Sequence, residues 1–248
     1  MELISQTSPR LAGRPILEQF WADLTFVHWR VDAADVAPLL PPGVVPDVFD
    51  GSSWVGLIPF RMQSTAALGG PQIPYFGAFT EVNVRLYAVD EQGRRGVVFA
   101  SLEASRLAAV AGARLGFGLP YFWADATAAR RGEEFAYRSE RLASGRRADR
   151  PVSHVISRNL GVPVVDDPLA DFLSARWRLF LERNGRTVMM PNQHGPWPLF
   201  TAQLEHLHDD LVAAAGLPGV TDREPDSVLF SPGVLTQFGL PEKYPARR

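Results

Sequence analysis

The stretch Phe79-Thr80-Glu81-Val82-Asn83-Val84-Arg85-Leu86-Tyr87 decides the fold expected for this chain. Apolar and polar residues alternate along it, which gives a side-chain period of two and predicts a β-strand. One side of that strand carries Thr80, Val82, Val84 and Leu86, and the other carries Phe79, Glu81, Asn83, Arg85 and Tyr87. The side with the branched apolar residues can pack into a core.

The other side of this strand carries an acid, an amide and a base in a row between two aromatic residues. Such a row is typical of the wall of a polar cavity inside a barrel. An edge strand with an exposed salt bridge would give the same pattern. The stretch by itself leaves both interpretations open.

Composition fits a globular protein with one sizeable core. The chain has 248 residues, 46% of them hydrophobic and 21% charged, and we expect a single domain over residues 1–248 because β-rich domains of this length are common. A net charge of -2 and a pI of about 6.2 argue against nucleic acid and anionic membrane surfaces as partners. The absence of Cys excludes disulfides, thiolate catalysis and Cys-ligated metals.

The termini and the apolar runs carry no targeting signal. Met1 to Pro15 has no apolar h-region and is expected to form a loose arm. No stretch reaches the roughly 18 unbroken apolar residues of a membrane span, so we expect a cytoplasmic protein with no membrane partner. The only lysine is Lys243, which leaves almost no amine for covalent catalysis.

Hairpins dominate the rest of the chain. Further strands are expected at about 24–31, 44–49, 53–62, 96–103, 122–129, 134–142, 153–157, 177–182, 187–190 and 199–207, and a strand pair broken around Pro232-Gly233 at 228–238. Short helices are expected at about 33–40, 106–115, 169–176 and 209–215. The pattern predicts a β-rich α+β fold with a largely antiparallel sheet. No Gly-rich phosphate loop is present, so we expect no nucleotide cofactor. The Gly/Pro-rich segment Thr65–Gly77 is either a lid over a site or a plain surface loop.

Several ordered motifs together resemble one family. They are His28-Trp29-Arg30-Val31-Asp32, Phe49-Asp50-Gly51 with the strand from Trp54 to Met62, the strand from Phe79 to Tyr87, Ala113-Arg114 with Leu119-Pro120-Tyr121-Phe122, His194-Gly195-Pro196-Trp197-Pro198-Leu199 and Ser231-Pro232-Gly233-Val234. On these motifs most of the chain resembles the DUF2071, or YqjF-like, family. That family is similar to the acetoacetate decarboxylase superfamily, which implies a cone-shaped, largely antiparallel barrel around a pocket.

The resemblance to acetoacetate decarboxylases also suggests site residues. Arg30 resembles an arginine on their first strand, and Phe79-Thr80-Glu81 matches an aromatic-Thr-Glu triplet whose glutamate lines the pocket. Arg114 matches the arginine of a Gly-Arg-Glu stretch. Where the decarboxylases carry Pro-Lys-Lys, with the Schiff-base lysine, this chain has Pro120-Tyr121-Phe122. The resemblance therefore implies that the pocket is kept and the Schiff-base mechanism is lost.

Two functions remain open at this point. In the first, a cofactor-free lyase or isomerase acts on an oxo or hydroxy acid: Arg85 or Arg30 anchors a carboxylate, Glu81 moves a proton and Tyr121 polarises a carbonyl. In the second, the same wall, with Asn83, binds a small anionic or polar ligand without chemistry. A homo-oligomer is compatible with either.

The pairing of Glu81 separates the two hypotheses. We expect Glu81, Arg85 and Arg114 to converge on one internal cavity with Tyr121 at its wall, and Glu81 to pair with Arg114. A paired carboxylate would favour architecture or binding. A carboxylate left among Phe79, Phe117 and Tyr121 would have a raised pKa and would favour catalysis.

A metal site is the remaining candidate from residue types. His206 and His208 share one face of an expected strand, with Glu205 between them, and such a His pair can ligate zinc or iron when a carboxylate joins it. A solvated His pair is the simpler interpretation. We therefore expect no metal and no other cofactor.

Overall fold

The computed structural model describes residues 4–74, 77–107, 118–142 and 150–244, and it is built mainly from one 13-stranded sheet. The strands are β1 Leu17–Val31, β2 Val44–Pro46, β3 Ser53–Ala67, β4 Phe79–Asp90, β5 Arg95–Ala104, β6 Tyr121–Arg131, β7 Glu134–Arg141, β8 Val152–Pro163, β9 Arg178–Arg183, β10 Arg186–His194, β11 Phe200–Asp209, β12 Ser227–Phe238 and β13 Glu242–Lys243. The described helices are α1 Ala33–Val36, α3 Pro168–Ser174 and α4 Leu211–Ala214, with 3-10 turns at η1 Ala37–Leu39 and η3 Val220–Asp222.

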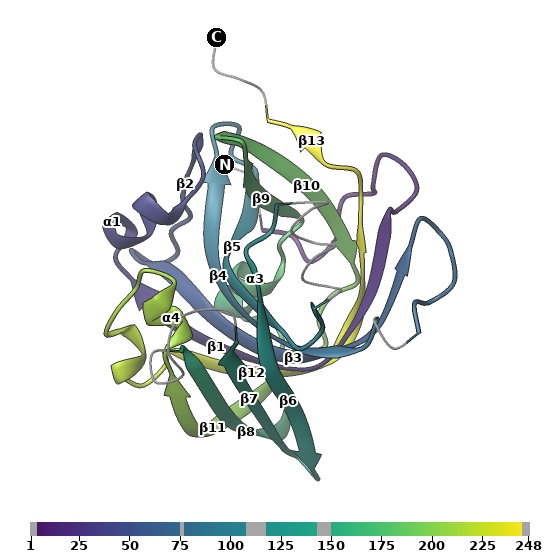
Figure 1. Cartoon of the computed structure of the whole chain (residues 1–248). Coiled ribbons are helices and arrows are strands. Elements are labelled where there is room, and N and C mark those ends of the chain that lie inside the picture. Colours follow the sequence, from purple (N-terminus) through teal and green to yellow (C-terminus); the bar gives the residue numbers. More distant parts are fainter. Residues whose placement is uncertain (1–3, 75–76, 108–117, 143–149, 245–248) are drawn as a thin grey trace.

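The sheet closes in part into a ring (Figure 1). Its strand order is β13-β10-β9-β5-β6-β7-β8-β11-β12-β1-β3-β4-β2, and additional pairings join β10 to β12 and β5 to β4. Most neighbours run antiparallel, whereas β5 is parallel to β6 and to β9. The predicted fold class, a β-rich and largely antiparallel α+β fold with a few short helices, is confirmed.

Strand β4 lies at the centre of this arrangement and is buried along its whole length. It pairs with β3 and then β2 along one edge and with β5 along the other. Val82, Val84 and Leu86 pack into one apolar cluster, while Phe79 and Tyr87 belong to a second cluster that fills the inside of the ring. The edge-strand interpretation of this stretch is therefore wrong, because both edges and both faces are covered.

Helix α3 is fixed to the inner cluster by local signals in the sequence. Asp167 caps it by accepting hydrogen bonds from the backbone N–H groups of Leu169 and Ala170, at 2.9 and 3.1 Å. Pro168 stands at the first helical position, where its missing N–H is harmless. The helix buries Phe172 and Leu173 and so carries a backbone carbonyl into the ring.

Two expectations about irregular segments need correction. The last strand is not a broken pair around Pro232-Gly233, because β12 pairs with β1 over its full length. Gly233 allows the continuous pairing with φ +127, since a Cβ there would lie 2.0 Å from the carbonyl oxygen of Trp21.

The loop Thr65–Gly77 is shorter than expected, because β3 continues to Ala67. The expected helix at 106–115 lies almost wholly outside the described residues.

Among the helices in the described ranges, none has the length and apolar character needed to cross a bilayer.

Candidate functional site

Glu81 occupies the inner face of β4 and is 1% exposed. The hydroxyl of Tyr121, at the start of β6, donates a hydrogen bond of 2.9 Å to its Oε2. β6 runs parallel to β5 there and pairs Tyr121 with Leu102, which places the phenol across one strand from Glu81. Burial raises the pKa of the Glu81 carboxyl from its usual 4.5 to about 8, and Tyr121 and Asn83 only partly oppose that rise. The carboxyl is therefore mostly protonated at neutral pH.

Asn83 follows Glu81 on the same face of β4 and is completely buried. Its amide is close enough to lower the pKa of Glu81, yet neither its Nδ2 nor its Oδ1 makes a hydrogen bond of normal geometry to a described residue. A buried amide without partners is unfavourable by about 1–3 kcal/mol. Such a group is a good candidate for contact with a ligand.

Arg85 continues the row with a buried guanidinium. Its Nε donates to the Tyr87 hydroxyl at 2.9 Å and its Nη2 donates to the carbonyl of Leu173 at 2.9 Å. The guanidinium also lies over the rings of Phe26 and Tyr87, 5.2 and 5.4 Å from their centroids. No carboxylate of the described residues pairs with Arg85. A buried cation held only by neutral groups favours an anion beside it.

His28 lies against the same tyrosine. Its Nε2 is 2.6 Å from the Tyr87 hydroxyl oxygen, and burial, followed by the charge of Arg85, keeps its pKa well below the usual value. The Tyr87 oxygen also lies 3.2 Å from the carbonyl of Leu173. If Tyr87 donates to that carbonyl, His28 must donate from Nε2, which leaves a buried Nδ1 acceptor without a partner among described residues.

Gly56 explains how the imidazole of His28 fits against β3. The two residues are paired between β1 and β3, and Gly56 is also paired with Arg85 of β4. A Cβ at Gly56 would lie 2.7 Å from His28 Nε2 and 2.7 Å from Ile58 Cδ1. The glycine therefore provides the space in which His28 approaches Tyr87.

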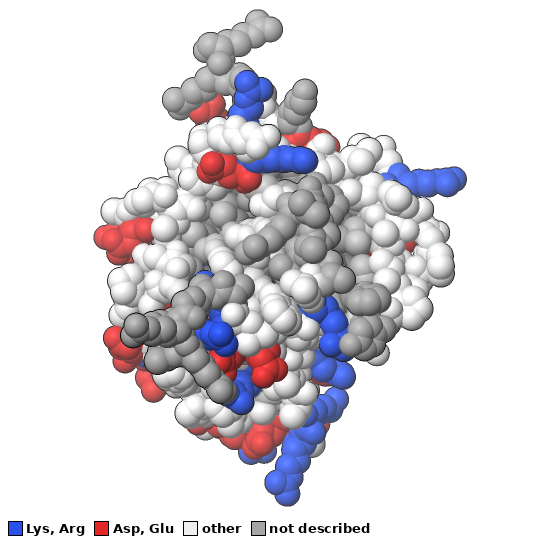
Figure 2. All heavy atoms as spheres, viewed as in Figure 1, with Lys and Arg blue, Asp and Glu red and all other residues white. Residues whose placement is uncertain are grey.

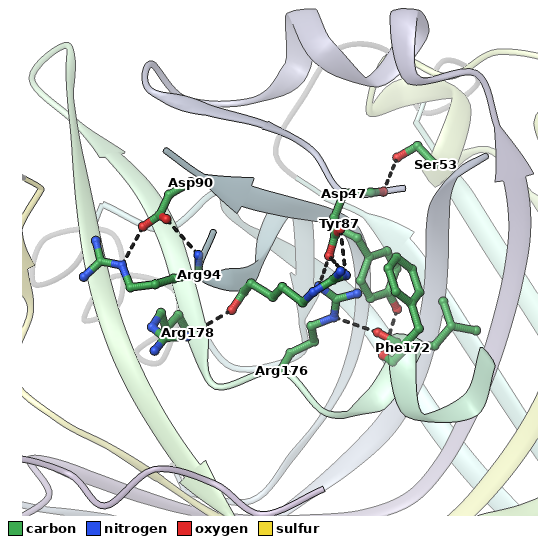
Figure 3. A network of polar contacts seen from close by, with 10 residues as sticks. Asp47, Ser53, Tyr87, Asp90, Arg94, Phe172, Arg176 and Arg178 are labelled. Atoms are coloured by element: carbon green, nitrogen blue, oxygen red, sulfur yellow. Dashed lines mark hydrogen bonds and ion pairs between the residues drawn. The ribbon is translucent and has the colours of Figure 1, made fainter. Parts of the chain in front are cut away.

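A second network stands behind Tyr87 and supports it (Figure 3). The buried carboxylate of Asp47 accepts from Arg95 and from Arg176, with closest distances of 2.6 Å in both cases. Arg176 also lies over the rings of Tyr87 and Phe172, at 4.9 and 4.2 Å. Burial lowers the pKa of Arg176, and Asp47 opposes that shift. Arg176 is thus the second guanidinium, after Arg85, that contacts the Tyr87 ring.

A small cavity opens near Arg85, with a volume of about 60 Å³. Its lining includes Trp177, His194 and Trp197, and the imidazole of His194 lies 4.5 and 5.3 Å from the two indole rings. Trp197 packs edge-on against Phe26 at 5.4 Å, and Phe26 in turn lies under Arg85. Burial lowers the pKa of His194 to about 4, with Arg85 adding to the shift. The cavity therefore lies between α3 and the two tryptophans, and Phe26 stands between Trp197 and Arg85.

The N-terminal arm covers this cavity. Gln6 lines it and donates to Asp171 at 2.7 Å, and Trp177 Nε1 donates to the carbonyl of Ser5 at 3.1 Å. These described residues of the arm are thus attached to the wall rather than loose.

The predicted site residues are only partly brought together. Glu81, Asn83 and Arg85 share the inner face, and Tyr121 contacts Glu81. Arg30 lies elsewhere: it pairs with Asp50 at 3.1 Å, with one third of its side chain exposed. The contacts of Arg30 do not include the inner row: near the end of β1 it still pairs with Trp54 of β3, and its side chain reaches Asp50 in the 49–52 turn.

The expected pairing of Glu81 is not seen in the described part of the chain. Arg85 turns away to Tyr87 and Leu173, and Arg114 and Phe117 fall outside the described residues.

The Tyr87–His28 pair was missed as part of the site, although both residues stand in motifs quoted from the sequence. The signal that could have identified Tyr87 is the alternation of side chains along β4, which places Tyr87 on the same face as Arg85.

The other polar groups do not form a comparable candidate site among the described residues. The rings of His154 and His206 lie 4.7 Å apart on β8 and β11, but the described residues contain no group of three or more His, Asp or Glu arranged to hold a metal ion. On the face shown in Figure 2, acidic and basic side chains are both scattered over the surface. The inner row of β4 remains the candidate site, with Glu81, Asn83 and Arg85 all buried on one face.

Fold and site together define a class of β-rich proteins with a partly closed, ring-shaped sheet that carries an acid, an amide and a guanidinium on its inner wall. The chain belongs to the DUF2071 family, described as uncharacterized conserved proteins, whose family model matches residues 18–235. It is similar to the uncharacterized protein YqjF of Bacillus subtilis (strain 168), with 33% identity over 205 residues that cover 82% of each chain.

Solved structures with the same fold are decarboxylase-like. Acetoacetate decarboxylase from Legionella pneumophila aligns with a TM-score of 0.66 and 13% identity, covering 96% of this chain and 92% of that one. An acetoacetate decarboxylase-like enzyme from Sphingomonas wittichii RW1 gives 0.64 and 15%, covering 94% of each. The enduracididine biosynthesis enzyme MppR, complexed with a condensation product of pyruvate and imidazole 4-carboxaldehyde, gives 0.62 and 16%, covering 93% and 90%. At such low sequence identities, the structural similarity supports a shared fold and does not by itself support a shared activity.

Proposed function

We propose that this protein is a cofactor-free lyase or isomerase that moves a proton next to the carbonyl of an oxo or hydroxy acid. The observation that carries the proposal is the buried Glu81 carboxyl, which Tyr121 contacts and no described cation neutralises. A carboxyl with a pKa of about 8 exchanges protons readily at neutral pH. General acid–base groups are usually tuned in this way by burial.

The proposed step is an enolisation. The ionised fraction of Glu81 accepts the proton from the C–H bond beside the carbonyl, and the electron pair of that bond moves to the carbonyl oxygen. Tyr121 then turns its hydroxyl from Glu81 to that oxygen and donates a hydrogen bond to it. Return of the proton to carbon completes an isomerisation or an exchange, and loss of a leaving group completes a lyase reaction. Arg85 holds the carboxylate of the substrate.

A Schiff base plays no part in the proposed mechanism. The sequence offers only Lys243, whose backbone lies on β13 and pairs with Val188 at the end of the strand order. Where the resemblance places the decarboxylase lysines, this chain has Tyr121 and Phe122 at the start of β6, and neither side chain carries an amine. Borohydride treatment with acetoacetate should therefore leave the protein unmodified.

The experiment that tests the proposal is hydrogen–deuterium exchange on a panel of oxo acids in D₂O, followed by proton NMR. The expected result is exchange beside the carbonyl of at least one acid, reduced about 10²–10⁴-fold in Glu81→Gln. The matched control is Glu91→Gln, which changes a carboxyl in the hairpin after β4. Equal exchange by Glu81→Gln and the wild type would reject Glu81 as the proton carrier.

A binding module is the second candidate. It is favoured by Arg85, which has no carboxylate partner among described residues, and by the unpartnered amide of Asn83. An acid that raises the melting temperature but is never exchanged at carbon would support this alternative.

A further inference from the structure

Tyr121 reaches Glu81 from a short junction between strands. β6 runs beside β5 only from Tyr121 to Trp123, and from Ala124 onwards it pairs with β7. Successive side chains of a strand point to opposite faces, so a slip of one residue at this junction would turn Tyr121 away from Glu81. The hydrogen bond between the two residues therefore depends on whatever fixes the register of β6.

The next residue, Phe122, is fixed on the opposite face of this junction. The guanidinium of Arg141 lies over its ring, with 3.6 Å between Arg141 Cζ and the ring centroid. Arg141 is the last residue of β7 and pairs with Ala124, which follows Phe122 by two residues. A guanidinium stacked on an aromatic face is a favourable and oriented contact. This contact therefore joins β6 to β7 at the point where β6 leaves β5.

Arg141 is in turn held by β5. Its Nε donates to the two carboxylate oxygens of Glu103 at 3.1 and 3.2 Å, and its Nη2 donates to the Ser101 hydroxyl at 3.0 Å. The Ser101 hydroxyl donates to Glu103 Oε1 at 2.6 Å. Glu103 is completely buried, and Arg141 is 8% exposed. Several hydrogen bonds to one planar group fix its orientation, and in that orientation the guanidinium covers Phe122.

This ion pair and the contact between Glu81 and Tyr121 lie at the same level of the sheet, on opposite faces. Glu103 is paired with Val82 of β4 on one side and with Phe122 of β6 on the other. Val82 directly follows Glu81, and Phe122 directly follows Tyr121. When Phe122 keeps to the face of the ion pair, alternation therefore turns Tyr121 to the face that carries Glu81.

We propose that Phe122, Arg141 and Glu103 form a register clamp. Its two charged members are positioning residues, because they hold the Tyr121 hydroxyl against Glu81. The proposal rests on the proposed function only for its effect on the reaction, since the place of the hydroxyl can be measured without a substrate. A buried ion pair adds little net stability, because the cost of taking two charges out of water offsets most of their attraction. Buried ionic groups are better suited to specify one register among several.

Replacement of the whole ion pair tests the clamp. The double variant Glu103→Leu/Arg141→Met keeps the side chains close in size and leaves no unpaired buried charge, so it should stay folded. Carbon NMR of the labelled Glu81 carboxyl then gives its pKa, which is about 8 in the wild type. In the double variant this pKa should shift towards the value in Tyr121→Phe. Adding Tyr121→Phe to the double variant should then produce less than half of the shift that it produces in the wild type.

A second arginine–glutamate pair provides the matched control. Arg158→Met/Glu205→Leu removes a pair that joins β8 and β11 at the surface. This control should leave both the pKa of Glu81 and the effect of Tyr121→Phe unchanged. A folded clamp double variant in which Tyr121→Phe still produces its full shift would overturn the clamp.

A variant of the stacked ring covers the case in which the double variant does not fold. Phe122→Leu removes the ring and keeps the ion pair of Arg141 and Glu103. It should likewise reduce the shift that Tyr121→Phe produces. A full shift in this background would equally show that the clamp does not position Tyr121.

Deuterium exchange of the oxo acids separates the clamp from the proposed function. If the wild type exchanges an acid, the clamp double variant should slow that exchange about as much as Tyr121→Phe does. No exchange by the wild type, together with a reduced Tyr121→Phe shift in the double variant, would reject the proposed function and leave the clamp standing. Exchange by the wild type, together with a full shift in the double variant, would reject the clamp and leave the proposed function standing.

Discussion

The Tyr121 hydroxyl lies 2.9 Å from Glu81 Oε2, and this contact joins two strands that are far apart in the sequence. Tyr121 stands in the position where acetoacetate decarboxylases, by resemblance, carry their lysine pair. A phenol can donate or accept a hydrogen bond but cannot form an imine. Glu81 lies buried on β4, and burial raises the pKa of its carboxyl to about 8.

The first prediction concerns stability against pH. The folded pKa of Glu81 is about 8 and lies above the usual 4.5, so the folded chain binds more protons than the unfolded chain between these values. The contribution of protonated Glu81 to the free energy of unfolding is therefore fully present below about pH 4.5 and falls as the pH rises towards 8. Glu81→Gln does not titrate, so the variant should not lose this contribution at high pH. The full shift corresponds to an upper bound on the order of 5 kcal/mol.

Thermal unfolding of both proteins from pH 5 to pH 9 measures this effect. The two melting temperatures should be close at pH 5, and Glu81→Gln should melt several degrees higher at pH 9, at about 2–4 °C per kcal/mol. A constant difference over the whole range would mean that Glu81 ionises in the folded protein as it does in water.

The second prediction concerns the space beside His28. Gly56→Ala places a Cβ 2.7 Å from His28 Nε2 and from Ile58 Cδ1, so the imidazole must move away from Tyr87. We expect a destabilisation of about 1–3 kcal/mol, typical of overpacking in a core. Gly195→Ala is the matched control, because nothing lies within 4 Å of its added Cβ. Urea unfolding should separate the two, and equal midpoints would contradict the packing described for Gly56.

The third prediction compares a buried ion network with an exposed pair. Asp47→Asn leaves Arg95 and Arg176 without the carboxylate that both of them contact, which should destabilise the fold by about 3–5 kcal/mol. Asp50→Asn removes the carboxylate that pairs with Arg30 at the surface, where 73% of the Asp50 side chain is exposed. That change should cost no more than about 1 kcal/mol. Denaturant unfolding measures both, and similar losses would show that the inner network contributes no more than a surface pair.

The sequence predicts the fold well where one strong pattern governs. The alternation from Phe79 to Tyr87 gives the strand, its two faces and the row of polar residues. The motifs on either side give the family. β12 was harder to predict, because Gly233 suggests an interruption, and only the paired strand shows that its missing Cβ makes room for the Trp21 carbonyl.

The partners of the site residues were less predictable than their positions. Glu81 and Tyr121 are 40 residues apart, and the phenol reaches the carboxylate only because β6 runs parallel to β5. Arg30 and His28 are two residues apart on β1. Side-chain alternation along a strand therefore predicts that they point to the same face. At Arg30, however, β1 still pairs with β3 but no longer with β12, and Asp50 and Asp226 bind the side chain. Where the pairing with β12 ends depends on long-range contacts that the sequence pattern does not reveal.

The last prediction concerns the hydrogen bond between Tyr121 and Glu81. A phenol that donates to a carboxylate stabilises the charged form, so this bond lowers the pKa of Glu81 and opposes the effect of burial. Tyr121→Phe removes the donor and keeps the ring. The pKa of Glu81 should then rise above about 8, and the pH at which exchange reaches half its maximum should rise with it. Carbon NMR of the labelled Glu81 carboxyl measures the pKa directly, with Tyr244→Phe as a control, since Tyr244 bonds to Gly43 at the other side of the sheet. A lower pKa in Tyr121→Phe would mean that water enters beside the carboxyl when the hydroxyl is lost, and that Tyr121 acts mainly by keeping the site dry.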